Sequence, residues 1–400
     1  MKRVLICLQL IFLILMGSVP VFSDELDFDI ESTHVILINM NDDSVLYEKD
    51  PDSIISIASL TKIMTAIVAV EKIEDIHAKT RITSSDLAGL VEANASVAGF
   101  AVGEEVTYED LLYGLLLPSG ADAAQTLART TYGSVKVFVS MMNQKAQKLG
   151  MEHTHFANTT GLDAEENYST INDVVKMFRY ALDNEILKEI MDTEIYRTSD
   201  GKLTLYSILR RKYLYDCAYI VGGKTGSTYA AGLCMASYAY YNGVYYMLVS
   251  SGAPYNRENP WAFIDAAKIY GYFMQNYAYH NIVDYPDVVL TLPVQYGRED
   301  TIDFCAREHL DVYLPDSYDK RALTYDYHGR DIVRPNDHVG DYFGSVDIFY
   351  EGEKMITVDL YLQEKVHFSL WKYLKGNALW FAVPTLLVII LYQRRKKSEG

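Results

Sequence analysis

A serine and a lysine three residues apart, Ser59 and Lys62, form the first pair whose chemistry follows from spacing. On a helix, residues i and i+3 share one face, so the hydroxyl and the amine can meet. A hydroxyl becomes a good nucleophile when a base takes its proton, and a lysine can be that base where burial or nearby positive charge disfavours its ammonium form. The pair predicts serine nucleophilic catalysis, although the same spacing also occurs by chance with a solvated lysine.

A second motif could move the proton. Residues 119–122 read Ser-Gly-Ala-Asp and follow an apolar run. The hydroxyl of Ser119 could relay a proton between Lys62 and a leaving group. Taken alone, the same segment also fits an ordinary loop that caps a helix.

A third motif, residues 224–227, could bind a substrate. The Lys224 amine and the Thr225 hydroxyl can bind a carboxylate. Gly226 lets a substrate backbone approach a strand edge, and the N–H of Ser227 can join the N–H of the nucleophile as an oxyanion hole. Each motif alone is weak evidence, but the three in this order predict a serine acyl-transfer site.

The segments that must position these motifs alternate between extended and helical patterns. Alternating apolar residues predict a hairpin at 34–49, and the Asn-Gly pair at 242–243 predicts another within an extended region at 217–251. Helices are expected over four stretches, at 59–72, 107–150, 170–192 and 262–277. After about residue 281, a small all-β module is expected from short strands at 288–294, 310–314, 346–350 and 355–362.

Both ends of the chain carry apolar segments. Residues 1–23 have a charged start, an apolar stretch and helix-breaking residues, which predicts a cleaved secretory signal peptide, with an uncleaved anchor as the alternative. Residues 376–392 are apolar and precede four basic residues at 394–397. This pattern predicts one transmembrane helix with a cytoplasmic tail, and a buried C-terminal helix is the alternative.

The composition narrows the class of protein. The chain has 400 residues, a formal net charge of −17 and 50% hydrophobic residues. This hydrophobic content excludes a disordered chain, and the acidic balance argues against a partner nucleic acid. The four cysteines are too few for a disulfide scaffold, and neither they nor the nine histidines show the spacing of metal ligands. No metal and no other cofactor is therefore expected.

Longer stretches around the motifs, at 57–65, 117–124, 155–163 and 222–228, resemble the low-molecular-mass D-alanyl-D-alanine carboxypeptidases, serine peptidase family S11. This family belongs to the penicillin-binding-protein and serine β-lactamase superfamily. The resemblance covers about residues 30–275. It implies an α+β transpeptidase fold, an antiparallel sheet flanked by helices, followed by the small all-β domain and the transmembrane helix. The expected parts are a signal peptide at 1–23, a catalytic domain at 24–280, a β-rich domain at 281–366 and a membrane segment with its tail at 367–400.

The resemblance also implies a reaction. Ser59 would attack the carbonyl of the penultimate D-Ala of a peptidoglycan stem pentapeptide, release the terminal D-Ala, and form an acyl-enzyme that water hydrolyses. Lys62 would be the general base and Ser119 the proton relay, while Lys224 and Thr225 would hold the terminal carboxylate. β-Lactams would acylate the same serine. The catalytic domain would face the extracytoplasmic side of a bacterial cell membrane, held there by the C-terminal helix.

One position departs from the family pattern. Ala121 stands where the family commonly has an asparagine, and its methyl group offers neither donor nor acceptor. We interpret it as lining the substrate site, at a cost of about 1–3 kcal/mol for the lost contact. This departure keeps open a catalytically weakened penicillin-binding protein tethered to the membrane. A DD-endopeptidase or transpeptidase is a second alternative, and a class A β-lactamase a third, which the absence of a Glu-x-x-Leu-Asn context disfavours. Arg257 could assist carboxylate binding or be a surface residue.

Overall fold

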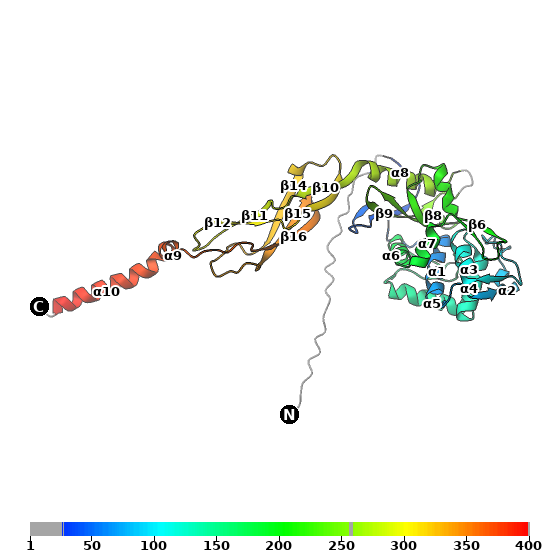
Figure 1. Cartoon of the computed structure of the whole chain (residues 1–400), viewed down its shortest axis with the longest axis horizontal. Coiled ribbons are helices and arrows are strands. Elements are labelled where there is room, and N and C mark those ends of the chain that lie inside the picture. The colour runs from blue at the N-terminus through cyan, green and yellow to red at the C-terminus, as the bar shows by residue number, and fades with distance from the viewer. Residues whose placement is uncertain (1–25, 27, 256–258, 399–400) are drawn as a thin grey trace, which may run out of the picture. The chain divides into compact units, whose positions relative to one another are not determined.

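The computed structural model describes residues 26, 28–255 and 259–398 (Figure 1). The chain divides into two compact units, Met1–Gln275 and Asn276–Gly400. The predicted signal peptide at 1–23 and the arginine at 257 lie outside the described residues.

An antiparallel sheet of five strands, in the order β2-β1-β9-β8-β7, is the frame of the first unit. Its strands are β1 (His34–Asn39), β2 (Val45–Lys49), β7 (Ile220–Thr228), β8 (Gly232–Tyr241) and β9 (Val244–Ala253). Both predicted hairpins are confirmed, the second turning at Asn242 and Gly243 as the Asn-Gly signal requires. The strand that carries the third motif, β7, lies at the edge of the sheet, where its unpaired backbone groups can meet an extended ligand.

Helices cover both faces of this sheet. The central helix α1 (Thr61–Val70) is buried along its whole length and shares one core with Met247 and Val249 of β9. The opposite face is covered by α8 (Trp261–Asn276), whose Tyr270 hydroxyl donates to the carbonyl of Ser237 at 3.0 Å (Figure 1). The other helices of this unit are α2 (Ser84–Leu87), α3 (Tyr108–Leu116), α4 (Ala121–Tyr132), α5 (Val135–Lys148), α6 (Ile171–Leu182) and α7 (Glu185–Asp192).

The predicted helical stretches are interrupted where the chain must turn. The stretch at 59–72 begins with a 3-10 turn, η1 (Ala58–Leu60), before α1. The stretch at 107–150 contains three helices and the stretch at 170–192 contains two. Between α3 and α4, Ser119 adopts a left-handed backbone with φ of +67°, which no helix tolerates. Two short pairs of strands complete this unit, β3 (Lys79–Arg81) with β4 (Glu105–Thr107) and β5 (Ile195–Arg197) with β6 (Thr204–Tyr206).

The second unit is rich in β-strands, as the sequence predicts. It contains the pairs β10–β13 and β11–β12 and a three-stranded sheet, β14-β15-β16. Four of its strands match predicted ones, namely β11 (Val288–Pro293), β13 (Leu310–Pro315), β15 (Tyr342–Tyr350) and β16 (Glu353–Tyr361). Three were not predicted, namely β10 (Tyr277–Val283), β12 (Thr301–Cys305) and β14 (Leu323–Gly329).

Two helices end the described chain, α9 (Leu370–Gly376) and α10 (Ala378–Ser398). Within the part of the chain that the structure describes, no helix combines enough length with enough apolar character to span a bilayer. The transmembrane helix predicted at about 376–392 is therefore not confirmed.

Candidate active site

The nucleophile candidate, Ser59, lies in the 3-10 turn that leads into α1. The residue before it, Ala58, has a φ of +45°, a strained value for an alanine. A side chain on Gly161 would place its Cβ 1.9 Å from the carbonyl oxygen of Ala58, so only glycine fits there. The turn that presents the hydroxyl is thus held against a neighbouring loop.

The amine of Lys62 meets that hydroxyl. Its Nζ donates to Ser59 Oγ at 3.0 Å and to the carbonyl oxygen of Thr160 at 2.5 Å. The side chain is only 2% exposed, and burial lowers its pKa to about 7, against the opposing influence of the Asp122 charge. A large fraction of this amine is therefore neutral near pH 7, as a general base requires.

A loop that the sequence analysis gave no catalytic role, residues 158–162, fixes the lysine. The Asn158 side chain accepts from the N–H groups of Thr160 and Gly161 and donates to the carbonyl of Leu162. This turn aims the Thr160 carbonyl at Lys62. The signal was present in the sequence, since an asparagine followed three residues later by a glycine is typical of a tight turn that uses the asparagine side chain.

The second serine is paired with a second buried lysine. Lys224 Nζ donates to Ser119 Oγ at 3.0 Å and to the carbonyl of Thr225 at 2.7 Å. The side chain is 2% exposed, and burial first, then the charge of Lys62, hold its pKa well below the usual value. The structure therefore places the Lys224 amine on Ser119, behind the surface of the cavity rather than in it.

The Ser-Gly-Ala-Asp motif also fastens a loop. The N–H of Ala121 donates to the carbonyl of Ser96 at 2.7 Å, and the Asp122 carboxylate accepts from the N–H groups of Ala98, Gly99 and Phe100. These contacts bring Ser96 to the cavity, a residue that the sequence analysis missed and that no local spacing signals. The Ala121 side chain, at 1% exposure, is buried beneath this loop and does not line the cavity.

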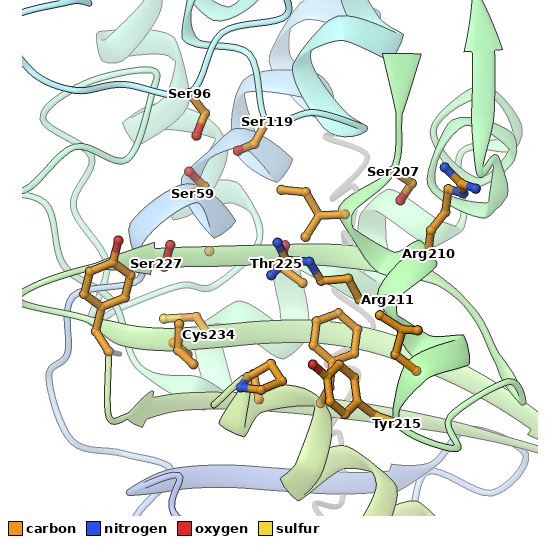
Figure 2. Close-up of a pocket in the computed structure, with 18 of the residues that line it drawn as sticks. Ser59, Ser96, Ser119, Ser207, Arg210, Arg211, Tyr215, Thr225, Ser227 and Cys234 are labelled. Carbon is orange, nitrogen blue, oxygen red and sulfur yellow. The ribbon is translucent and has the colours of Figure 1, made fainter. Parts of the chain in front are cut away.

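A cavity of about 880 Å³ joins these groups (Figure 2). Ser59, Ser96 and Ser119 line it on one side, and residues 225–227 of β7 line it as well. A Cβ on Gly226 would lie 2.9 Å from the backbone nitrogen of Ser59, so the strand edge lies directly against the nucleophile. This is the arrangement that an oxyanion hole from two backbone N–H groups requires.

The far wall of the cavity carries two arginines that the sequence analysis missed. Arg210 and Arg211 belong to the 3-10 segment η2 (Ile208–Leu214), and both line the cavity. Figure 2 shows the Arg211 side chain extending toward Thr225. The sequence feature that could have pointed to them is a pair of adjacent arginines in a strongly acidic chain. Guanidinium groups at this wall are suited to bind a carboxylate.

No cluster of three or more histidine, cysteine or acidic side chains in the described ranges is placed to hold a metal ion. The chemistry available to these residues is nucleophilic attack by a serine, with lysines handling protons. Together with the helix-flanked antiparallel sheet, this defines an enzyme of the penicillin-binding-protein class, with its acyl-transfer site between η1, the 119–122 turn and β7.

Comparison with known proteins gives the family. The sequence profile of Peptidase_S11, described as D-alanyl-D-alanine carboxypeptidase, matches residues 21–254. Because the match spans more than half of the chain, the chain belongs to this family, as the resemblance of its motifs implied.

Individual relatives agree with this assignment. The D-alanyl-D-alanine carboxypeptidase DacF of Bacillus subtilis is 28% identical over 330 residues, which cover 81% of this chain and 82% of that protein. The DD-transpeptidase of Streptomyces K15 is similar in structure, with a TM-score of 0.56 and 32% identity over 61% of this chain and 97% of that one. Penicillin binding protein 5 of Haemophilus influenzae shares the fold over 86% of this chain, with a TM-score of 0.64 and 22% identity.

Proposed function

We propose that this protein is a serine-type D-Ala-D-Ala carboxypeptidase that removes the terminal D-alanine from peptidoglycan stem pentapeptides. The observation that carries the proposal is the buried Lys62 amine, 3.0 Å from the Ser59 hydroxyl and beside the glycine-bearing edge of β7. Membership of the S11 family supports the same activity.

The geometry supports the following order of events. Lys62 takes the proton of Ser59, whose oxygen attacks the carbonyl of the penultimate D-Ala. The N–H groups of Ser59 and Ser227 stabilise the negative charge that develops on the carbonyl oxygen. The proton passes through Ser119 to the leaving nitrogen, the C–N bond breaks, and D-alanine departs. Water then hydrolyses the ester on Ser59 with Lys62 again as base, and a β-lactam would acylate the same oxygen.

The terminal carboxylate would lie over the first residues of the Lys-Thr-Gly motif. Thr225 faces the cavity there, and the Arg211 guanidinium extends toward it (Figure 2). Lys224 would not touch the carboxylate. It would hold Ser119 by a hydrogen bond and, when protonated, add positive potential near the carboxylate. Ala121 contributes its backbone N–H to the 96–100 loop and no side-chain contact to this arrangement.

Mass spectrometry of the purified protein tests the proposal. Incubation with a stem pentapeptide should yield the tetrapeptide and free D-alanine, and incubation with penicillin should yield a covalent adduct on the peptide that contains Ser59. Cleavage of cross-linked dimers in preference to pentapeptide would instead establish the endopeptidase, and transfer to an added amine the transpeptidase. Binding without any turnover would establish the weakened penicillin-binding protein.

The acylation rate should depend on pH through Lys62. Its pKa is lowered from 10.5 to about 7, so the neutral amine that accepts the serine proton predominates only above about pH 7. We expect the second-order rate of penicillin acylation to rise about tenfold per pH unit below pH 7 and to level off above it. Stopped-flow acylation between pH 5 and 9 measures this profile, and a rate that keeps rising toward pH 10 would contradict a lowered pKa.

We further propose that the chain is exported and held by its C-terminal segment at the extracytoplasmic face of a bacterial membrane. The segment at 376–392 supports this, because apolar side chains in it, Trp380, Leu386 and Leu391 among them, are exposed. The basic residues at 394–397 that follow are typical of a cytoplasmic flank. In this proposal the signal peptide ends at residue 23, the catalytic domain covers 24–280, the β-rich domain 281–366 and the membrane segment 367–400.

Deleting residues 376–400 should release active enzyme. The deletion removes the exposed apolar helix and leaves the serine–lysine site intact, so we expect the protein to move from the membrane pellet to the supernatant with its D-alanine release unchanged. Ultracentrifugation of cell lysates with a D-alanine assay on both fractions measures this. Truncated protein that still sediments with membranes would refute the C-terminal anchor.

A further inference from the structure

The active-site cavity is larger than a terminal D-alanine requires. Its volume is about 880 Å³, within the range of pockets that enclose most of a drug-sized ligand. In the proposed reaction the scissile carbonyl lies at Ser227 and the terminal carboxylate at Thr225. Figure 2 shows Arg211 and Tyr215 on the far side of Thr225 from Ser227. That part of the cavity therefore faces the leaving residue, whose side chain in D-alanine is only a methyl group.

Apolar side chains form a wall in that part of the cavity. Leu214 and Tyr215 lie at the end of η2, Phe263 lies in the first turn of α8, and all three line the cavity. The Tyr215 and Phe263 rings have centroids 5.9 Å apart, so the two elements are in contact. Leu214 is 74% exposed, so a ligand carbon placed against it would remove apolar surface from water. We call these three side chains the apolar wall.

Two arginines beside the apolar wall have no acidic partner. Within the described residues, neither Arg210 nor Arg211 forms an ion pair with an aspartate or glutamate. Glu194, which lies near this segment, is bound instead by Lys212 at 3.1 Å. The Arg210 guanidinium lies over the Tyr206 ring, 5.0 Å from its centroid. Two positive charges without a carboxylate partner should repel a ligand that brings a third positive charge to this part of the cavity.

We propose that the apolar wall is a subsite for an extended, uncharged side chain on the terminal D-residue, so that the protein also releases D-amino acids larger than alanine from stem peptides. The inference rests on the proposed function and adds a class of substrates to it. The bond that breaks is the same amide, between the penultimate D-Ala carbonyl carbon and the leaving nitrogen. Water again supplies the hydroxyl group of one product and the proton of the other. A cationic side chain of equal length is disfavoured by Arg210 and Arg211.

Three tripeptides test the subsite directly. They are Nα,Nε-diacetyl-L-Lys-D-Ala-D-Ala and the two analogues that end in D-norleucine or D-lysine. The last two side chains have the same four carbons, and only that of D-lysine ends in an ammonium group. We expect kcat/KM of the full-length protein to be about tenfold higher for release of D-norleucine than of D-alanine, because three further methylene groups are buried. Release of D-lysine should be at least about tenfold slower than release of D-norleucine.

Two variants separate the apolar contact from the charge. Leu214→Ser should reduce the ratio of D-norleucine to D-alanine release toward one, and Leu214 is exposed enough that its replacement should not disturb folding. Arg210→Gln should raise release of D-lysine relative to D-norleucine. When the peptides compete in one sample, each ratio is independent of how much of the variant is folded.

An exposed valine provides the matched control. Val91 is 88% exposed and does not line the cavity, so Val91→Ser should keep both wild-type ratios. Wild-type protein that releases D-norleucine no faster than D-alanine, or a ratio that is unchanged in Leu214→Ser, would overturn the inference while leaving the carboxypeptidase assignment intact. Equal release of D-lysine and D-norleucine would overturn the role of the arginines. Release of no terminal residue from any tripeptide or from the pentapeptide would instead refute the proposed function itself.

Discussion

Replacing Ser59 with alanine is expected to abolish both covalent labelling by penicillin and release of D-alanine from a stem pentapeptide. The Ser59 hydroxyl is positioned to attack, because Lys62 Nζ lies 3.0 Å from it and the β7 edge lies against its backbone nitrogen. Loss of a serine nucleophile costs on the order of 10⁶-fold in turnover in the best-studied serine protease. Gel detection of fluorescent penicillin and an assay for free D-alanine measure the two effects.

Ser96→Ala is the matched control for this prediction. It removes a serine hydroxyl from the same cavity, but that hydroxyl has no lysine partner in the described structure. Labelling and D-alanine release should therefore persist in Ser96→Ala. Release of D-alanine by Ser59→Ala at more than a trace of the wild-type rate would show that the nucleophile lies elsewhere.

Lys62→Met should slow acylation by about 10²- to 10⁴-fold, the usual contribution of a positioned general base. Methionine keeps the length and fills the buried space, so the change removes the proton acceptor with little change in packing. The Thr160 carbonyl loses its amine partner, and about 1–3 kcal/mol of stability should be lost with it. The rate of penicillin adduct formation and the melting temperature measure the two effects separately.

Lys212→Met separates the catalytic effect from the structural one. Lys212 is also buried, and its Nζ also donates to a backbone carbonyl, that of Ile220 at 2.7 Å, but its side-chain partner is the Glu194 carboxylate at 3.1 Å instead of a serine hydroxyl. This variant should lose comparable stability and retain most of its acylation rate. A Lys62→Met protein that acylates as fast as Lys212→Met would exclude Lys62 as the base.

Local spacing was enough to predict the catalytic pair and the hairpins. Ser59 and Lys62 are one helical turn apart, so their contact depends on the local backbone over three peptide bonds rather than on the fold. The Asn-Gly turn between β8 and β9 is equally local. What spacing could not reveal is the 3-10 turn before α1, because the left-handed backbone of Ala58 packs against Gly161, about a hundred residues away.

The placement of Lys224 shows where sequence reasoning about the site reached its limit. Side chains alternate across a strand, so Lys224 and Gly226 share the face that meets η1, while Thr225 is on the other. The motif predicted an amine near the substrate carboxylate, but only the fold reveals that this amine binds Ser119. The two arginines of η2 and Ser96 reach the cavity through contacts distant in sequence, which no local pattern encodes.

Strand β14 was missed for a different reason. Most side chains of β14 are exposed, so the strand lacks the alternation of apolar and polar residues by which strands are recognised. Its place is fixed by pairing with β15, from Leu323 opposite Tyr350 to Gly329 opposite Gly344. Such a strand forms because the neighbouring strand has unpaired backbone groups at its edge. Its own residues need only be compatible with an extended backbone.

The two buried lysines disfavour positive charge on each other. A positive charge on Lys62 makes the same charge on Lys224 less favourable. When Lys62 gains the serine proton, protonation of Lys224 therefore becomes less favourable. A proton taken up by Lys62 is therefore favoured to leave toward the departing D-alanine nitrogen rather than to be joined by a second charge on Lys224.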